Sequence, residues 1–227
     1  MTKKTFRLVP RDEADFKQLI KVWYDDFLKT PYNNHWLLQA GLGPYNKGTA
    51  NLNDRSQKVS LLGQESRIVN LGGTIGIPQS PVKRAGTVSL GTYLFFPVLA
   101  KLCDGIEDPK RDLAECAKQF LDGGAQYELS IDNERIEDLL VHFRVTTDEF
   151  PVLFREDGIY SIFGFGKGET KGVVDGIWIL LLLEAGQHVV HLKADALLPY
   201  NDYLAPYIGR NHFRLDVTYE IDVGGQI

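Results

Sequence analysis

The chain has 227 residues, of which 44% are hydrophobic and 24% are charged, and its formal net charge is −5. A chain of this size and composition can bury a large core without a structural metal or a disulfide. The acidic balance argues against a nucleic-acid partner, because phosphate binding requires clustered lysines and arginines. We therefore expect a globular protein that needs no cofactor.

Targeting and membrane-spanning segments are not evident in the sequence. The first thirty residues contain no apolar stretch of the kind found in secretory signal peptides. The longest apolar run, Ile177 to Leu183, is far shorter than the roughly twenty residues of a membrane-spanning helix. The sequence as written predicts a soluble, cytoplasmic protein without a membrane span.

Residues 12–28 are predicted to form the first helix, because their apolar side chains recur at the spacing of one helical face. These side chains are Phe16, Leu19, Ile20, Trp23 and Phe27. Asp12 and Glu13 lie where the helix dipole is positive, and Pro31 ends the segment. Residues 41–58 are rich in glycine and asparagine, which predicts a loop.

Short strands are predicted from residue 67 onward. Residues 67–71 and 87–99 have the composition of strands, and Pro97 marks either the end of the second strand or a bulge in it. A second helix is predicted over residues 109–121. Asp108 is a suitable N-cap for it, and two glycines follow its end.

The C-terminal half is predicted to be β-structure. A turn at Asp132 is expected between strands over 126–131 and 139–146, and a hairpin is expected between 178–183 and 188–194.

Residues 213–223 alternate between apolar and polar side chains without interruption. Successive side chains of a strand point to opposite faces of a sheet, so this segment predicts a strand with one buried and one exposed face. Such half-exposed strands are typical of antiparallel sheets. The apolar face would hold Phe213, Leu215, Val217, Tyr219, Ile221 and Val223.

Two helices and six to nine short strands predict a mainly β fold, which is α+β leaning towards all-β. The expected architecture is an antiparallel β-sandwich of jelly-roll or immunoglobulin-like type. We expect a single sandwich domain over residues 1–227, with an N-terminal helical extension over about residues 1–60.

A long loop rich in tyrosine and proline is predicted over residues 195–211. Tyr200, Tyr203 and Tyr207 in this loop, together with Trp178, are the candidate ligand-binding residues. Exposed aromatic rings on a rigid sandwich provide apolar area, and tyrosines add a hydroxyl; the same rings can instead pin the loop to the body of the protein. We expect a non-enzymatic binding or interaction module for a protein or carbohydrate ligand, with no catalytic residue assigned.

The alternative is a glycoside hydrolase that uses two carboxylates about 5–10 Å apart, a separation that a sequence does not reveal. The candidate carboxylates are Glu128, Asp132, Glu156, Asp157, Glu169 and Asp175. A third possibility is a homo-oligomer in which exposed sheet faces pair.

A metal site is not indicated. His188 and His191 are three residues apart on a predicted strand, so they point to opposite faces and do not share a metal. The acidic, glycine-rich segment 155–176 lacks the spacing of a Ca²⁺ loop and is interpreted as solvated. Cys103 and Cys116 are the two cysteines. Two buried free thiols are favoured over a disulfide, which would indicate an oxidising compartment.

Six stretches of the sequence are informative as an ordered set. They are Asn70–Gly76, Tyr93–Leu99, Leu113–Ala117, Asp175–Leu180, Glu184–His188 and Val217–Tyr219. Together they resemble a family of uncharacterised bacterial proteins, often exported, that share the pattern AGT…FFP…CA…DGYW…PGxH…VTY. The resemblance covers residues 60–223. This family has no assigned activity, so the resemblance implies a β-sandwich fold and no chemistry.

The resemblance changes two expectations. The family pattern favours cysteines near Cys103 and Cys116, which makes a disulfide as plausible as free thiols, and an oxidised pair would fit an exported protein. The family's asparagine after the FFP motif falls near Ala100, so any polar role of that residue is lost or moved.

Overall fold

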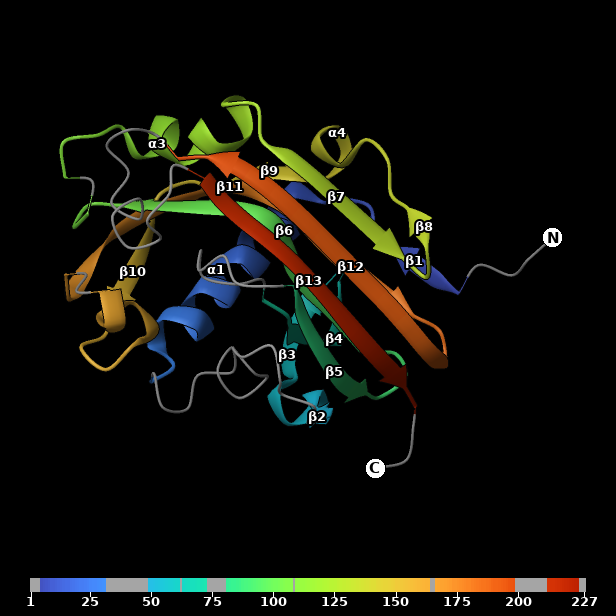
Figure 1. Ribbon diagram of the computed structural model, residues 1–227. Coiled ribbons are helices and arrows are strands. Elements are labelled where there is room, and N and C mark those ends of the chain that lie inside the picture. Colours follow the sequence, from blue (N-terminus) through green and yellow to red (C-terminus); the bar gives the residue numbers. More distant parts are fainter. Residues whose placement is uncertain are drawn as a thin grey trace.

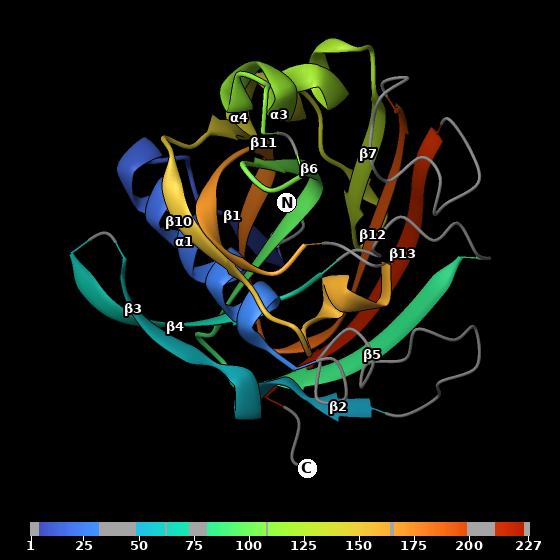
Figure 2. The same cartoon turned by 90° about the vertical axis from the view of Figure 1, so that its left-hand side faces the viewer.

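The computed structural model describes residues 5–31, 49–61, 63–72, 81–107, 109–163, 166–198 and 212–224. These residues form two facing β-sheets, with a long helix on the outer side of one sheet (Figure 1, Figure 2). One sheet contains β1 (Phe6–Leu8), β3 (Gln57–Leu61), β4 (Gln64–Asn70), β6 (Tyr93–Asp104), β9 (Arg144–Thr146), β10 (Phe150–Phe154) and β11 (Gly168–Leu183). The other contains β2 (Thr49–Asn51), β5 (Val82–Val88), β7 (Gln126–Ile131), β8 (Glu134–Arg135), β12 (Gly186–Leu197) and β13 (His212–Val223).

The described helices are α1 (Glu13–Lys29), α3 (Leu113–Asp122) and α4 (Leu139–Phe143), with 3₁₀ turns η2 (Leu52–Arg55) and η3 (Ile159–Phe163). None of the described helices combines the length and the apolar character needed to cross a membrane. The predicted mainly β, sandwich-like fold is confirmed at this level, although the described residues hold three α-helices where two were predicted.

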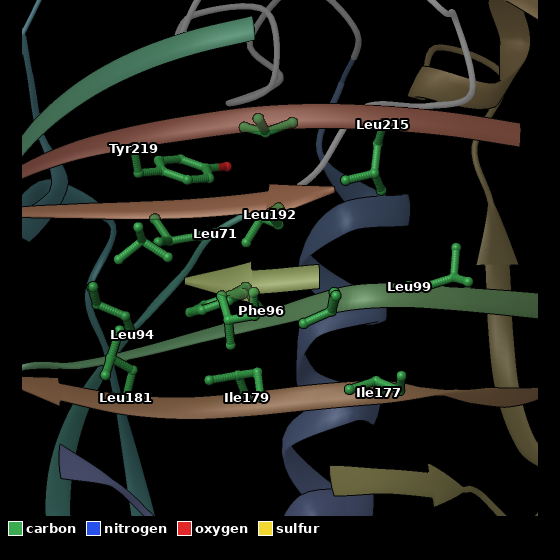
Figure 3. Packing of buried hydrophobic residues seen from close by; sticks show 14 of the residues in the cluster. Leu71, Leu94, Phe96, Leu99, Ile177, Ile179, Leu181, Leu192, Leu215 and Tyr219 are labelled. Carbon is green, nitrogen blue, oxygen red and sulfur yellow. The ribbon is translucent and has the colours of Figure 1, made fainter. Parts of the chain in front are cut away.

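The main core fills the space between the two sheets. Figure 3 shows Leu94, Phe96, Ile177, Ile179 and Leu181 of β6 and β11 facing Leu192, Leu215 and Tyr219 of β12 and β13. Removing these apolar side chains from water stabilises the fold by about 25 cal/mol for each Å² that is buried.

Helix α1 packs on the outer face of the sheet that contains β11, and it begins and ends as predicted. Asp12 is its N-cap and accepts the Asp15 N–H at 3.0 Å, while Thr30 is its C-cap. Its apolar face forms a second core cluster with side chains that include Phe95 and Trp178. The predicted helix over residues 12–28 is confirmed.

The closing strand β13 confirms the predicted alternation, since its apolar face is buried and its polar face is partly or fully exposed. The prediction of antiparallel sheets is wrong in part. β13 pairs antiparallel with β12 but parallel with β5. β5 also pairs parallel with β2, and β4 pairs parallel with β6, so both sheets are mixed. A half-exposed strand has the same alternation whichever direction its neighbour runs.

Strand β11 lies at the centre of its sheet and is buried on both faces. One edge pairs with β6, and the other pairs in turn with β10, β9 and β1. Ile177 and Ile179 face the opposite sheet, whereas Trp178 and Leu180 face α1. Strands buried on both faces form continuous apolar runs, which explains the run from Ile177 to Leu183.

The predicted hairpin around residues 184–187 is wrong. Both edges of β11 are already paired, so after Leu183 the chain crosses to the other sheet, where β12 pairs with β13 and β7. Gly186 makes this step with φ 130°, a backbone conformation that favours glycine. A short glycine-containing linker fits both a hairpin within one sheet and a crossing between two sheets. The pairing of β12 with distant strands decides between the two.

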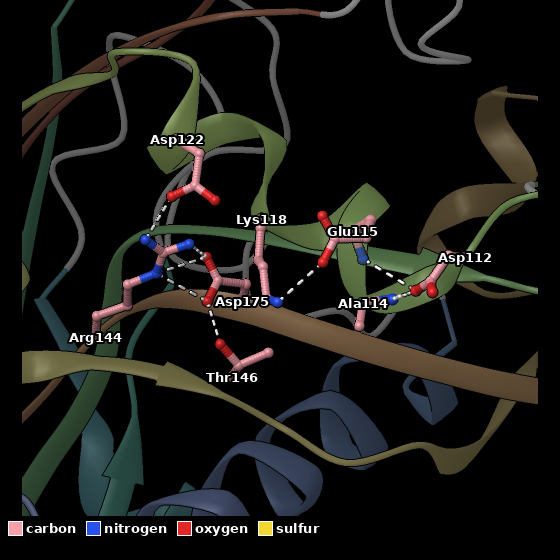
Figure 4. Close-up of polar contacts among 8 residues, drawn as sticks. All are labelled: Asp112, Ala114, Glu115, Lys118, Asp122, Arg144, Thr146 and Asp175. Atoms are coloured by element: carbon pink, nitrogen blue, oxygen red, sulfur yellow. Dashed lines mark hydrogen bonds and ion pairs between the residues drawn. The ribbon is translucent and has the colours of Figure 1, made fainter.

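Helix α3 begins at Leu113, later than predicted. The Asp112 carboxylate accepts the N–H groups of Ala114 and Glu115 at 3.0 and 3.1 Å, so Asp112 is the N-cap (Figure 4). Asp108, the predicted N-cap, lies outside the described residues. The helix ends at Gly123, as predicted.

Residues 139–146 are not one strand, because their first part forms α4. A half-exposed strand over these residues would bury Val141 and Phe143 on the same face. Val141 is instead 69% exposed, whereas Leu139 and Phe143, one helical turn apart, are buried. Over five residues an alternating pattern and a helical pattern are hard to distinguish.

Two further predictions concern short elements. Residues 41–58 were expected to be a loop, but the described part of this range holds β2, η2 and the start of β3. At Pro97 the bulge alternative is correct, because the pairing of β11 with β6 shifts register between Ile177 and Trp178, opposite Pro97.

Cys103 of β6 and Cys116 of α3 form a disulfide across a sequence separation of 13 residues. The two cysteines lie in a small apolar cluster with Ala117 and Val173. The bond therefore fastens α3 to the sheet that contains β11. Of the two states left open by the sequence, the structure has the disulfide.

Replacing both cysteines by alanine is expected to lower the free energy of unfolding by about 3 kcal/mol, because the bond restricts the unfolded chain. Urea unfolding of the oxidised protein, the reduced protein and the C103A/C116A variant measures this difference. If oxidised and reduced protein unfold at the same urea concentration, the disulfide does not contribute as we expect.

Candidate functional site

Trp178, one of the four candidate ligand-binding residues, is fully buried between β11 and α1. Its ring stacks on Phe95 at a centroid distance of 5.2 Å and meets Trp23 edge-on at 5.5 Å. Trp178 is therefore a core residue rather than a surface residue. The other three candidates, Tyr200, Tyr203 and Tyr207, lie outside the described residues.

Asp175 is the most deeply buried of the six carboxylates considered for glycoside hydrolysis. Arg144 contacts it through Nε at 3.1 Å and Nη2 at 2.9 Å, and the Thr146 hydroxyl donates at 2.6 Å (Figure 4). Arg144 also binds Asp122 of α3 at 2.6 Å. The hydrogen bonds with Asp122 and Asp175 raise the pKa of Arg144. The hydrogen bond from Arg144 in turn lowers the pKa of Asp122. Asp175 thus anchors a salt-bridge network that joins α3, β9 and β11.

The other five carboxylates lie on β7 (Glu128), in the turn after it (Asp132), after β10 (Glu156 and Asp157) and on β11 (Glu169). Glu156 pairs with Lys167 and Asp157 with Arg155, while Glu128 and Glu169 are exposed. Asp132 belongs to the turn after β7. Carboxylates held by cations or backbone N–H groups are poorly placed to protonate a leaving group. Glycoside hydrolysis stays a prediction, and turnover of chromogenic glycosides would test it.

Asp132 fastens the turn between β7 and β8 to β12. Its carboxylate accepts from the Val189 N–H at 2.9 Å and the Thr5 hydroxyl at 2.9 Å, and it lies 2.8 Å from Nδ1 of His188. His188 is buried, and its Nε2 lies 2.9 Å from the Glu184 carbonyl oxygen. Burial alone would raise the pKa of Asp132, but these hydrogen bonds outweigh it and leave the pKa below its ordinary value.

Replacing Asp132 by asparagine is expected to lower the free energy of unfolding at pH 7 by about 1–2 kcal/mol, because hydrogen bonds to the charged carboxylate are lost. The pKa of this carboxyl is lower in the folded than in the unfolded chain. Its stabilisation is therefore present above about pH 4 and is lost as the pH falls through the folded pKa. Urea unfolding of both proteins should show a gap that shrinks below about pH 4. A gap of the same size at pH 3 would contradict the assignment, and Glu128→Gln serves as an exposed control.

His188 and His191 point to opposite faces of their strand, as predicted. On β12, His188 faces the interior and His191 faces outward, where its Nε2 lies 2.8 Å from Asp216. Within the described ranges, no group of three or more His, Cys, Asp or Glu residues is placed to hold a metal ion.

A groove of about 620 Å³ runs along α1 and is lined by residues that include Lys21, Asp25, Lys29 and Phe150. Lys29 pairs with Asp25 at 2.6 Å within the helix. Because charges of both signs line the groove and partly neutralise each other, it favours no particular class of ligand.

Arg84 of β5 is the one arginine that is buried within the described residues, with 3% of its surface exposed. It points inward like Val82 and Val88 of the same strand. Its Nη1 donates to the Tyr219 hydroxyl at 2.7 Å and to the Gly72 carbonyl oxygen. The Tyr219 hydroxyl donates to the same carbonyl, and the tyrosine ring lies 5.6 Å from the guanidinium carbon.

The opposite edge of the guanidinium, formed by Nε and Nη2, is buried and makes no hydrogen bond in the described part of the chain. Donors of a cation that are buried without acceptors carry a desolvation cost of several kcal/mol. Nε and Nη2 form the planar fork with which arginine binds a carboxylate through two parallel hydrogen bonds. Tyr219 and Gly72 thus hold Arg84 from one side and leave this edge preorganised for an anion.

Arg84 is not among the site residues predicted from the sequence. The available signal was the alternation over residues 82–88, which places Arg84 on the same face as Val82 and Val88. A charged residue on an apolar strand face is unusual. The predicted strand, however, began at Thr87 and left this segment out.

Comparison with known proteins does not identify a family. No family model and no curated protein matches the chain. A solved structure titled "Structure of PbICP-C in complex with falcipain-2" is similar at 11% sequence identity over 69% of this chain and 98% of that chain, with a TM-score of 0.23. A likeness with so low a TM-score carries no argument about this chain.

Proposed function

We propose that the chain is a non-enzymatic β-sandwich binding module whose ligand presents an anionic group to Arg84. The buried Nε–Nη2 edge of Arg84, without an acceptor among the described residues, supports this proposal. Oxygens of an anionic ligand would supply the acceptors and neutralise the charge. Tyr200, Tyr203 and Tyr207 stay candidate ligand contacts. The jelly-roll or immunoglobulin-like type of the sandwich and its resemblance to exported bacterial proteins stay predictions.

A binding role and a structural role for Arg84 differ in their effect on stability. Replacement by methionine removes a buried charge, and the Gly72 carbonyl keeps a donor in the Tyr219 hydroxyl. Replacing a buried unpaired charge by an apolar side chain of similar size is neutral or stabilising. We therefore expect R84M to unfold within about 1 kcal/mol of the unsubstituted protein, or at higher stability.

Binding is tested by calorimetric titration of the unsubstituted protein and R84M with acetate, benzoate, octanoate, octyl phosphate and inorganic phosphate. At least one of these anions should bind the unsubstituted protein and show no heat of binding with R84M. Failure of all five to bind, or equal binding to both proteins, would refute the proposal. A loss of about 3 kcal/mol or more in R84M would instead identify Arg84 as a structural residue.

A further inference from the structure

Building on the proposed binding function, we infer that the anionic group is a single planar carboxylate attached to an apolar body. Three features of the site carry this inference: the number of available cations, the geometry of the free edge, and the character of the surrounding side chains.

The first feature is charge. Of the other buried cationic groups in the described ranges, Lys101 lies 5.0 Å from the Phe120 ring and opposite Asp175 on β11. The two ring nitrogens of His188 face Asp132 and Glu184. Among the buried side chains of the described residues that carry a positive charge, Arg84 is therefore the one with donors that are buried and make no hydrogen bond. A phosphate dianion would bring two negative charges against one guanidinium, and burying the excess charge is costly. A carboxylate balances the charge.

The second feature is geometry. The free donors Nε and Nη2 lie in one plane and point in parallel, which matches the two oxygens of a carboxylate. The Gly72 carbonyl oxygen occupies the Nη1 side and would repel an anion there. The only edge open to the ligand is thus the planar fork.

The third feature is the apolar surroundings. Val217 and Ile221 flank Tyr219 on the inward face of β13. Val82 lies two residues before Arg84 on the inward face of β5. Figure 3 shows the Tyr219 ring among buried aliphatic side chains, including Leu71. A ligand with hydroxyl groups would leave them without partners against these side chains, whereas an alkyl or aromatic body gains from burial.

The inference is tested by calorimetric titration of the full chain with octanoate, octyl phosphate, octanamide and glucuronate. These probes differ in the head group or in the polarity of the body. We expect octanoate to bind at least tenfold more tightly than octyl phosphate or glucuronate, and octanamide not to bind. Arg84→Lys should weaken octanoate binding at least tenfold, because an ammonium cannot form the fork.

Lys83→Met is the matched control, since it removes a positive charge from the adjacent residue. Lys83 points to the outer face, where it pairs with Glu220, so octanoate binding should be unchanged. Tighter binding of octyl phosphate would overturn the carboxylate inference, and equal binding of glucuronate would overturn the apolar body. Either result leaves the proposed function standing, whereas the absence of binding by every anion refutes both.

Discussion

Replacing Asp175 by alanine is expected to lower the free energy of unfolding by about 3–5 kcal/mol, because a buried salt bridge loses one partner. The Asp175 side chain is fully buried and accepts hydrogen bonds from Arg144 and Thr146. Without it, these donors face a cavity, and Arg144 keeps only the more exposed Asp122. Urea unfolding at pH 7, followed by tryptophan fluorescence, measures the difference.

Asp157→Ala is the matched control for this prediction. Asp157 also binds an arginine through two hydrogen bonds, from Nε and Nη2 of Arg155, but both side chains are largely exposed. Exposed ion pairs contribute about 0–1 kcal/mol, so D157A should unfold close to the unsubstituted protein. Equal losses in D157A and D175A would show that burial of Asp175 does not determine its contribution.

A double-mutant cycle separates the pair from the rest of the network. Asp175→Leu and Arg144→Met together should cost less than the sum of the two single replacements, because the double variant leaves no unpaired charge buried. Additive losses would indicate that Arg144 and Asp175 act independently.

The elements predicted correctly from the sequence have long, regular patterns. The alternation of β13 extends over eleven residues and the helical pattern of α1 over more than three turns, so chance matches to another period are excluded. The errors concern short or non-local features. α4 has five residues, and α3 begins four residues after the start predicted from Asp108. The partner of β12 depends on strands far away in the sequence.

The candidate site was less predictable than the fold for the same reason. The candidate site depends on the hydrogen bonds of Arg84 with Tyr219, which is 135 residues away, and with the Gly72 carbonyl oxygen. No local pattern joins these three residues. Trp178 shows the opposite case, since its place within a continuous apolar run already indicates a buried strand. Its aromatic ring alone suggested a ligand contact, whereas the apolar run around it indicates the core.

Replacing Trp178 by alanine is therefore expected to lower the free energy of unfolding by about 3–5 kcal/mol through the cavity it leaves beside Phe95 and Trp23. Trp178→Phe should cost less, about 1–2 kcal/mol, because the indole N–H has no hydrogen-bond partner in the described part of the chain and only volume is lost. Leu197→Ala, at a position that is 53% exposed, is the control and should change stability little. Urea unfolding ranks the three variants. If W178A is as stable as the unsubstituted protein, the Trp178 ring is not fully buried, because a fully buried ring cannot be removed without loss of stability. Trp178 would then again be a candidate ligand contact.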